Sequence, residues 1–499
     1  MTLSQLKARL EEIWNLNKIG GLLEWDMQTQ MPSGAINARA KHLATISKLS
    51  HEMFTAPETG RLLDSAEAEL ASASYDSDDV SLVRVARRDY EQQRKLPTQL
   101  VVEVSRVTAL AHNIWAKARA ENDFNAFAPS LEQIFTLERQ VAECLGFTEN
   151  IYDALLDNYE TGLTTAAAAK MFEDLRRDLV PLIKSISERV DAVDDSVLHQ
   201  PFDVTKQREF SEKVIEQFGY DFSRGRQDKA VHPFATSLSR DDVRITTRFD
   251  PNWLNPAMFG TFHETGHALY EQGVSAELEG NWLCHGTSLG IHESQSRLWE
   301  NIIGRSRGFW KHYYPPLQAT FPEQLGGVDL ETFYRAINKV KPSFIRVEAD
   351  EATYNLHIMM RFELEADLLN EKLKVADLPE AWNAKFKDYL GIVPPTNTLG
   401  VLQDVHWSSG LVGYFPTYSI GTVLSAQLFE KAVAQQPTIP TEVEQGKFDT
   451  LLGWLRENIH KHGRKFEPND LVKRATGEAL QTAPYINYLR QKYSDIYKL

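Results

Sequence analysis

One stretch, NPAMFGTFHETGHALYEQG at residues 255–273, restricts what this chain can fold into more than any other. Pro256 suits the first position of a helix, and Asn255 can cap that helix from in front. Gly273 is placed to end the helix in a left-handed turn. Between these ends two histidines lie one turn apart, with their side chains pointing the same way. The stretch therefore predicts a helix that presents two imidazoles together.

The two histidines have the spacing of metal ligands. His263 and His267 can chelate one Zn²⁺, and Glu264 lies beside them where it can hold a water on the metal. With 14 histidines in the chain, the pattern H-E-x-x-H arises by chance in roughly one sequence of this length in a hundred. Two core histidines on an unrelated helix are therefore the alternative. Because the helix has well-placed ends, we interpret the pair as zinc ligands.

Tetrahedral zinc needs a third protein ligand and leaves its fourth position to water. A second helix is predicted after the first, capped by Thr287 or Ser288. The candidates here are Glu293, His292 and His285. His285 precedes the helix and is the weaker choice. His292 points about 100° away from Glu293 on the same helix, so His292 and Glu293 cannot both be ligands. A glutamate from a second antiparallel helix completes a His, His, Glu set, which favours Glu293.

Helical periodicity dominates the rest of the chain. Four long stretches show it, at residues 35–56, 78–122, 124–146 and 164–190. DVRITTRF (242–249) is the clearest strand, KAVHPFAT (229–236) could pair with it, and SRGRQDK (223–229) has the composition of a loop. There is no long Gly/Ser linker and no repeat of fixed period. The sequence thus predicts a mainly α protein with a small β-sheet and a single domain, residues 1–499, with room for two lobes.

Charge and cysteine content exclude several classes of protein. The net charge is -15 and the pI is near 5.5, whereas nucleic acids and anionic membranes attract clustered Lys and Arg. The N-terminus is an amphipathic helix without a long apolar run, so neither a signal peptide nor a membrane span is expected. Two cysteines are too few for a disulfide scaffold. We expect a cytoplasmic protein with no nucleic-acid or membrane partner.

Eight motifs resemble those of the Taq-type zinc metallocarboxypeptidases. They are WDMQTQMPSGA (25–35), HPF (232–234), DVRIT (242–246), HETGH (263–267), HES (292–294), IRVEAD (345–350), GVLQDVHW (400–407) and GYFPTYSIG (413–421). The resemblance spans nearly the whole chain in order. It implies a helical fold with a deep active-site groove and with the small β-sheet near the zinc site. Helices of about residues 1–150 are expected to cover the groove, and the catalytic core is expected at about 200–430. It also implies a homodimer that releases single C-terminal residues from peptides with broad specificity. Co²⁺ or Mn²⁺ can occupy such ligands in place of Zn²⁺.

The expected chemistry is metal-assisted hydrolysis of a peptide bond. Glu264 is expected to take a proton from a zinc-bound water and to deliver it to the leaving amine. The oxyanion needs a donor besides the metal. Tyr418 is the first choice, although Tyr414 is equally compatible with the local sequence, and His232 and His406 stand behind it. Each of these four could instead be an ordinary buried side chain.

An exopeptidase must also bind a free C-terminal carboxylate, which suits arginine. Arg346 is expected to be that clamp, and Arg244 to line or order the groove. The alternative for both is a structural ion pair, with Asp350 or Asp242. Position 297, four residues after Glu293, holds an arginine where other zinc peptidases often place a carboxylate. The partners of the ligand histidines must therefore come from elsewhere, and Asp350 and Asp404 are the candidates.

Two other functions fit the same sequence. An endo-oligopeptidase would have the same zinc site and no carboxylate clamp, so it would ignore amidation of the peptide C-terminus. A helical scaffold with a vestigial or coincidental zinc motif would contain no stoichiometric metal.

Overall fold

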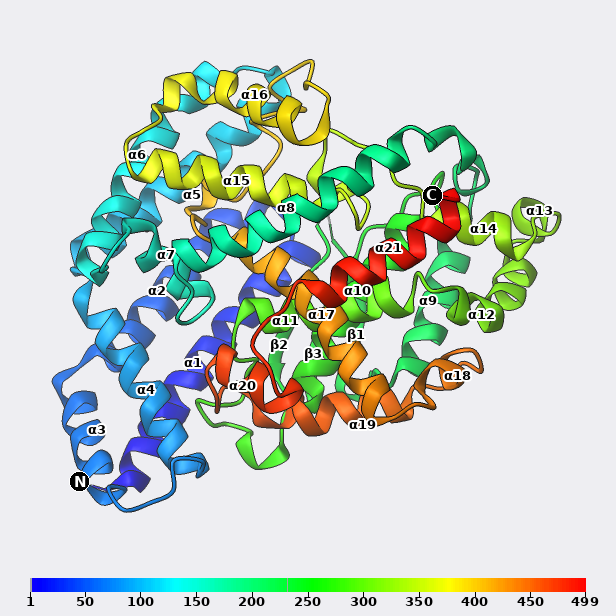
Figure 1. The fold of residues 1–499 in the computed structure, drawn as a ribbon. Coiled ribbons are helices and arrows are strands. Elements are labelled where there is room, and N and C mark those ends of the chain that lie inside the picture. Colours follow the sequence, from blue (N-terminus) through cyan, green and yellow to red (C-terminus); the bar gives the residue numbers. More distant parts are fainter. Residues whose placement is uncertain (1, 231) are drawn as a thin grey trace. The chain divides into compact units, whose positions relative to one another are not determined.

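The structure is a computed structural model that describes residues 2–230 and 232–499, most of them in helices (Figure 1). The mainly α prediction is confirmed. The chain forms two compact units, each built from separate segments. Unit 1 comprises Met1–Gln93, Asp194–Ile337 and Leu424–Leu480, and unit 2 comprises Arg94–Val193, Asn338–Val423 and Gln481–Leu499. Both the first 150 residues and the predicted catalytic core divide between the units, so a single domain with a covered groove stays a prediction.

Unit 1 contains the small sheet and the helices around it. Its helices are α1 (Leu3–Thr29), α2 (Ile36–Thr55), α3 (Pro57–Glu69), α4 (Asp78–Lys95, which ends in unit 2), α9 (Val204–Phe218), α10 (Asn255–Gly273), α11 (Leu289–Arg297), α12 (Arg307–Thr320), α13 (Pro322–Leu325), α14 (Leu330–Ile337), α18 (Ile439–Val443), α19 (Asp449–Asn458) and α20 (Pro468–Thr476). A π-helical segment, Leu298–Ile303, continues α11 without a break. In Figure 1, α10 and α11 lie beside the sheet, and α10 packs against α9, α11 and the sheet.

The sheet has three strands in the order β1-β3-β2. They are β1 (Gly225–Lys229), β2 (Ala235–Ser239) and β3 (Asp242–Thr247). The predicted strand at 242–249 is confirmed as β3, and β2 pairs with it antiparallel; Val231, in the predicted partner segment, lies outside the described residues. The loop predicted at 223–229 is wrong, because β1 pairs with β3 in parallel. Its Gln227 is buried and donates to Thr261 on α10 at 2.7 Å. A tertiary contact thus overrides a polar, strand-poor sequence.

The apolar face of α10 lies in an aromatic core. Phe259 and Phe262 are 2% and 0% exposed, and the Phe262 ring lies edge-on to Phe218 of α9 and Phe309 of α12, with centroids 5.3 and 5.8 Å apart. Burying a side chain of this size contributes about 1.5–3 kcal/mol. This core fixes the rotation of α10, and with it the direction in which the polar face of the helix points.

Both predicted ends of α10 are wrong in detail. Asn255 is the first helical residue and no side chain caps the helix. Gly273 is the last helical residue and has no positive φ. Its lack of a side chain serves packing instead, because a Cβ there would lie 2.6 Å from Nδ1 of His460. A local sequence pattern cannot reveal a neighbour that comes from almost two hundred residues further along the chain.

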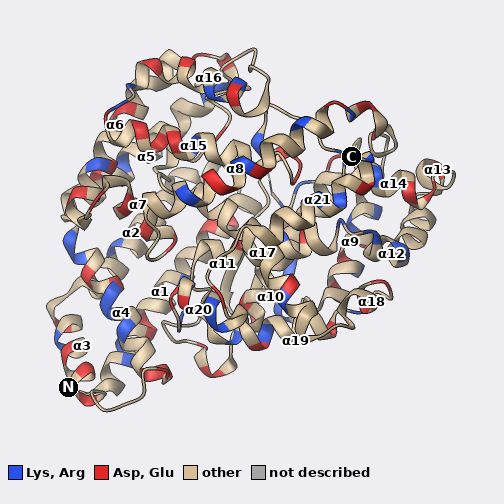
Figure 2. Ribbon diagram, in the orientation of Figure 1, with Lys and Arg blue, Asp and Glu red and all other residues tan. Residues whose placement is uncertain are grey.

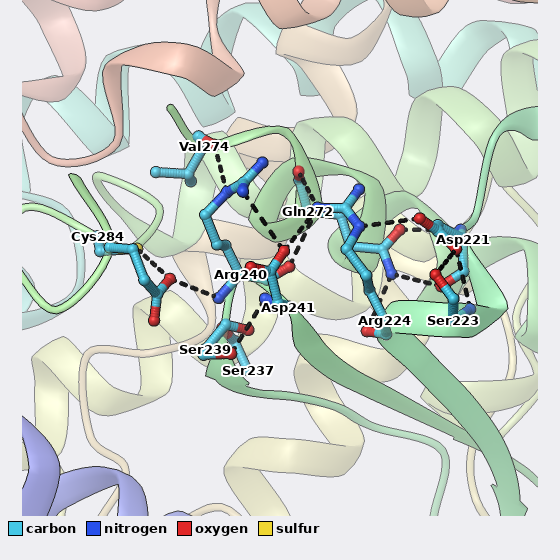
Figure 3. Close-up of polar contacts among 11 residues, drawn as sticks. Asp221, Ser223, Arg224, Ser237, Ser239, Arg240, Asp241, Gln272, Val274 and Cys284 are labelled. Carbon is cyan, nitrogen blue, oxygen red and sulfur yellow. Dashed lines mark hydrogen bonds and ion pairs between the residues drawn. The ribbon is translucent and has the colours of Figure 1, made fainter. Parts of the chain in front are cut away.

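The C-terminal end of α10 is held by polar side chains rather than by a glycine turn (Figure 3). Gln272 exchanges hydrogen bonds with the backbone of Asp221, accepting from its N–H and donating to its carbonyl, both at 3.0 Å. Arg224 donates to the carbonyl of Gln272 at 3.2 Å, and Arg240 donates to that of Val274 at 3.1 Å. Guanidinium groups at this end satisfy carbonyls left without helical partners and complement the helix dipole.

Unit 2 contains helices and the loops that join them, with no β-strand among its described residues. Its helices are α5 (Thr98–Glu121), α6 (Phe124–Leu145), α7 (Ile151–Tyr159), α8 (Thr165–Ser187), α15 (Tyr354–Leu369), α16 (Leu378–Leu390), α17 (Pro416–Gln435, which ends in unit 1) and α21 (Ala483–Tyr497). The predicted helical run at 78–122 is divided between α4 and α5 because Pro97 disfavours helical backbone at the residue before it. The long pairs α5 with α6 and α15 with α16 pack against each other.

Acidic and basic side chains are interleaved along the helices (Figure 2). At the two ends of α4 the charges are instead separated by sign: the acidic residues Asp78 and Asp79 lie in the first turn and the basic residues Arg94 and Lys95 in the last, which complements the helix dipole. No described helix is long and apolar enough to cross a membrane. Both cysteines are free thiols.

Candidate metal centre

A glycine lets α10 and α11 approach closely enough to share a site. A Cβ built on Gly266 would lie 2.5 Å from the carbonyl oxygen of Gln295 and 2.5 Å from the Cα of Ser296. Real Cβ atoms do not approach backbone so closely, so only glycine fits between these helices. As predicted, Ser288 caps α11, accepting from the N–H of Ile291 at 3.2 Å. The close crossing brings the polar faces of both helices together.

Three of the predicted ligands meet at this crossing. Oε2 of Glu293 lies 3.6 Å from Nε2 of His263 and 3.5 Å from Nε2 of His267. One ligand atom from each residue lies within 4.8 Å of the other two. Ligands bound tetrahedrally at about 2.1 Å from one ion are about 3.4 Å apart. The three side chains, which we call the metal-ligand cluster, therefore fit a single divalent ion.

A carboxylate orients the first histidine. Nδ1 of His263 lies 2.8 Å from Oε2 of Glu300, on the π-helical segment after α11. If Nδ1 carries the proton and donates it to Glu300, the lone pair of Nε2 faces the shared centre. Burial favours the neutral forms of both groups, but at Glu300 the charges of Arg297, His263 and Arg305 together outweigh it and lower the pKa of that carboxyl to about 2.

A second histidine orients the other ligand. Nδ1 of His267 lies 3.0 Å from Nδ1 of His292, whose Nε2 lies 2.6 Å from Oε1 of Glu271. Burial lowers the pKa of His267 to about 4, so this imidazole is neutral at pH 7. With Nε2 of His267 turned to a metal, its Nδ1–H donates to His292 and the Nε2–H of His292 donates to Glu271. The chain of contacts fixes which nitrogen of each ring carries the proton.

The expected partners of these histidines, Asp350 and Asp404, are wrong. Asp350 accepts hydrogen bonds from Thr353 and from the backbone of Lys341. Asp404 pairs with arginines, as described below. Glu300 lies seven residues after Glu293, on the same side of the helix, and that spacing could have revealed it in the sequence. The geometry of a π-helical segment, often found at functional sites, could not have been foreseen.

Arg297 occupies the position where other zinc peptidases often place a carboxylate. Its Nε donates to Oε1 of Glu293 at 2.7 Å and its Nη1 donates to Oε2 of Glu300 at 3.2 Å. Burial would raise the pKa of Glu293, but Arg297 and His263 outweigh it and hold that pKa well below the usual range. Ser296 adds a hydrogen bond to Oε2 of Glu293 at 3.1 Å. The third ligand is therefore held as an anion.

Glu264 behaves differently from these carboxylates. It lies on α10 next to His263 and is 5% exposed. Burial raises the pKa of Glu264 to about 7 although His263 opposes that shift. A carboxyl with a pKa near neutrality can both accept and release a proton at pH 7.

A separate group of predicted residues lies within unit 2, around Asp404. Arg346 donates from Nε to Oδ1 of Asp404 at 2.9 Å and from Nη1 to the hydroxyl of Tyr354 at 2.7 Å. Arg361 donates to Oδ2 of the same aspartate at 2.7 Å. Both arginines are buried, with 4% and 0% exposed. One carboxylate thus lies between two guanidinium groups, which leaves a net positive charge.

The predicted oxyanion residues belong to the same group. Nε2 of His406 lies 3.1 Å from the hydroxyl of Tyr418, and the guanidinium of Arg346 lies 5.1 Å from the centre of the Tyr418 ring. Tyr414 lies edge-on to Tyr418, with ring centroids 5.2 Å apart. The structure thus brings Arg346, His406 and Tyr418 together within unit 2.

The remaining two predicted residues lie in unit 1, outside the metal-ligand cluster. Arg244 on β3 makes the ion pair that the sequence offered as its alternative, with two hydrogen bonds of 2.8 Å to Asp242. It also lies over the ring of Trp25, 4.3 Å from its centre. His232 is exposed on the segment between β1 and β2.

Comparison with known proteins gives a single answer. The family model described as carboxypeptidase Taq (M32) metallopeptidase matches residues 5–493. Carboxypeptidase 1 of Bacillus subtilis (strain 168) is 40% identical over 98% of this chain and 97% of its own. Thermostable carboxypeptidase 1 of Thermus thermophilus is 41% identical over 97% of this chain and 96% of its own. The crystal structure of M32 carboxypeptidase from Deinococcus radiodurans R1 is similar at a TM-score of 0.96 and 42% identity, covering 99% of both chains.

Proposed function

This chain belongs to the carboxypeptidase Taq (M32) metallopeptidase family and is a metallocarboxypeptidase, and we propose that it releases single residues from the C-termini of peptides with broad specificity, using a zinc ion held by His263, His267 and Glu293. The observation that carries this proposal is the approach of the carboxylate of Glu293 to within 3.5 and 3.6 Å of the two histidine nitrogens. Two imidazoles and one carboxylate are the ligands of many catalytic zinc sites. Co²⁺ and Mn²⁺ suit the same ligands and are the expected substitutes.

Bound at these ligands, the ion supplies a Lewis acid that polarises the scissile carbonyl and acidifies a water molecule. We assign the movement of protons to Glu264. Its carboxylate takes a proton from the attacking water and passes it to the nitrogen of the leaving amino acid. The burial of Glu264 and its pKa near 7 support this role, because such a group reverses its protonation at neutral pH.

We further propose that the group around Asp404 recognises the substrate. Two buried arginines sharing one aspartate leave a positive charge that a C-terminal carboxylate would balance. Arg346 is the proposed clamp, and His406 helps to place the substrate. Tyr418 is the proposed donor to the oxyanion, since the contact with His406 orients its hydroxyl.

Arg244 and His232 are proposed to act from outside the metal-ligand cluster. The two hydrogen bonds from Arg244 to Asp242 favour an ordering role for that arginine. His232 is assigned a catalytic role only through the HPF motif. We also propose a homodimer in the cytoplasm, in keeping with two free cysteines and an acidic composition.

A pair of peptides that differ only at the C-terminus tests the proposed activity. The peptide with a free carboxylate should lose one residue at a time, as followed by mass spectrometry, and its amidated twin should be cut at least about 100-fold more slowly. Equal rates and internal cleavage would instead identify an endo-oligopeptidase. If the purified protein contained no zinc and cut neither peptide, a scaffold with an idle motif would be the better account.

A further inference from the structure

Besides Glu264, three carboxylates with little or no exposure lie around the crossing of α10 and α11, and one of these three has different partners from the other two. Glu293 and Glu300 each form ion pairs with Arg297. Glu271 is 5% exposed, and among the described residues its ion-pair partners are two histidines, with no arginine or lysine. A buried carboxylate is normally matched by a cation. Glu271 is therefore a buried anion without a permanent positive partner in contact.

The residues around Glu271 have the chemistry of metal ligands. Oε1 of Glu271 lies 2.6 Å from Nε2 of His292 and 3.4 Å from Nδ1 of His285, and it accepts from the N–H of Gly286 at 2.9 Å. One ligand atom each from Glu271, His285 and His292 lies within 4.8 Å of the others. We call these three residues the second cluster. Glu271 and His292 are buried, whereas the side chain of His285 is 50% exposed, which leaves a side open to solvent.

We propose that the second cluster binds a second divalent ion of the zinc or cobalt type, more weakly than the metal-ligand cluster does, and that this ion opposes binding of the first. This rests on the proposed occupancy of the metal-ligand cluster. A carboxylate and two imidazoles are a ligand set that both metals accept. The weaker binding follows from the exposed third ligand, since fixing His285 costs side-chain entropy.

The opposition follows from the direction of one hydrogen bond. The contact between the Nδ1 atoms of His267 and His292 is 3.0 Å long and needs one donor and one acceptor. A metal on Nε2 of His267 makes its Nδ1 the donor. A metal on Nε2 of His292 makes the Nδ1 of that ring a donor as well. With both ions bound, two N–H groups point at each other and the contact is lost.

Zinc titration of the chelator-stripped full-length protein tests this inference. Ions bound per chain are counted by equilibrium dialysis with elemental analysis, and peptide hydrolysis is followed at the same zinc concentrations. We expect activity to reach its maximum at about one ion per chain and to fall as a second ion binds. The release rate of the first ion into chelator should rise at least about tenfold over the same range.

His285→Ala separates the two sites, because the contacts described for His285 are with Glu271, Gly286 and His292 and not with the metal-ligand cluster. The variant should retain full activity at one ion per chain, and at least about tenfold more zinc should be needed for the second ion and for inhibition. His199→Ala, at another exposed histidine of unit 1, should behave as the wild type does. Glu271→Gln should also lose the second ion.

Three results would overturn the inference. The wild type could bind only one ion up to millimolar zinc, His285→Ala could bind and be inhibited as the wild type is, or a second ion could leave both activity and release of the first unchanged. Absence of peptide hydrolysis at every zinc concentration would count against the proposed function alone, since ion counts and release rates need no substrate.

Discussion

Buried carboxyl groups occur in both units, and their protonation differs. In unit 1, Glu271, Glu293 and Glu300 have pKa values well below the usual range, in each case against the effect of burial. In unit 2, burial raises the pKa of Glu138 to about 8 and that of Glu365 to about 7. Burial thus acts in the same direction at all five groups, and their partners decide the outcome.

The partners differ in kind. Around α11, Arg297 and the histidines supply positive charge or N–H donors directly to the carboxylates. In unit 2, Glu365 accepts from the neutral donors Trp407 and Gly413, and its charge raises the pKa of the neighbouring Glu138 beyond the effect of burial. Neutral donors offset less of the desolvation cost than charged ones do.

The difference teaches how a fold prepares a metal site. Carboxylates that are already ionised and oriented attract a cation without first releasing a proton, whereas protonated carboxyls would compete with it. The crossing of α10 and α11 is therefore built for a cation, and the Glu138–Glu365 region for packing. Glu264, whose pKa is near 7, is the exception in unit 1.

Replacing Glu264 should have the largest effect of the changes considered, and the effect should be on turnover. Glu264→Gln keeps the shape and removes the proton acceptor, so turnover should fall by about 10³-fold, within the range for lost acid–base catalysis. Zinc content, measured by elemental analysis, should be unchanged because Glu264 is not a ligand. A variant that retained full turnover would remove Glu264 from the mechanism.

Removing Arg297 should lower the free energy of unfolding of the metal-free protein, because the carboxylates of unit 1 would lose their positive partner. Arg297→Leu leaves Glu293 and Glu300 without their shared arginine, and breaking such a buried pair costs about 3–5 kcal/mol. Denaturant unfolding of the metal-free protein should show this loss, and added zinc should restore part of it. Arg177→Leu is the matched control at an exposed pair and should leave the free energy of unfolding nearly unchanged.

The third effect in size is expected at Glu300, where removing the charge should weaken zinc binding. Glu300→Gln keeps an acceptor for Nδ1 of His263 but loses the carboxylate that makes the ring more basic, so zinc affinity should fall about 10–100-fold. Competition with a chromogenic chelator measures it. An unchanged affinity would mean that Glu300 serves the fold and not the metal.

The smallest effect is expected at Glu138. It should appear when the free energies of unfolding of the wild type and of Glu138→Gln are compared across pH. Its folded pKa of about 8 exceeds the ordinary value of 4.5, so the folded state holds the extra proton between these pH values. The free energy of unfolding of the wild type should therefore fall as pH rises through that window. Glu138→Gln lacks this loss and should gain about 1–2 kcal/mol relative to wild type between pH 6 and 8. Parallel pH curves for the two proteins would contradict the assignment.

The sequence predicts what depends on local spacing. The helix α10, a cap at Thr287 or Ser288, the strand β3 and the convergence of two histidines with Glu293 all follow from periodicity and motif. The ends of α10 could not be predicted, because Arg224, Arg240 and His460 reach them from distant parts of the chain.

The contacts that orient the metal ligands could not be predicted from the sequence either, because they also join different elements. Glu300 contacts His263 from a π-helical segment, and His292 links His267 to Glu271 on the same helix. Asp350 and Asp404 lie in motifs, but a motif does not specify which side chain contacts which. Such contacts are fixed by packing between elements.

A crystal of the zinc-loaded protein, measured on both sides of the zinc absorption edge, tests the central claim most directly. The account predicts an anomalous peak at about 2.0–2.2 Å from Nε2 of His263, Nε2 of His267 and a carboxylate oxygen of Glu293. A fully loaded, active crystal with its strongest peak elsewhere, and those three side chains turned apart, would contradict it.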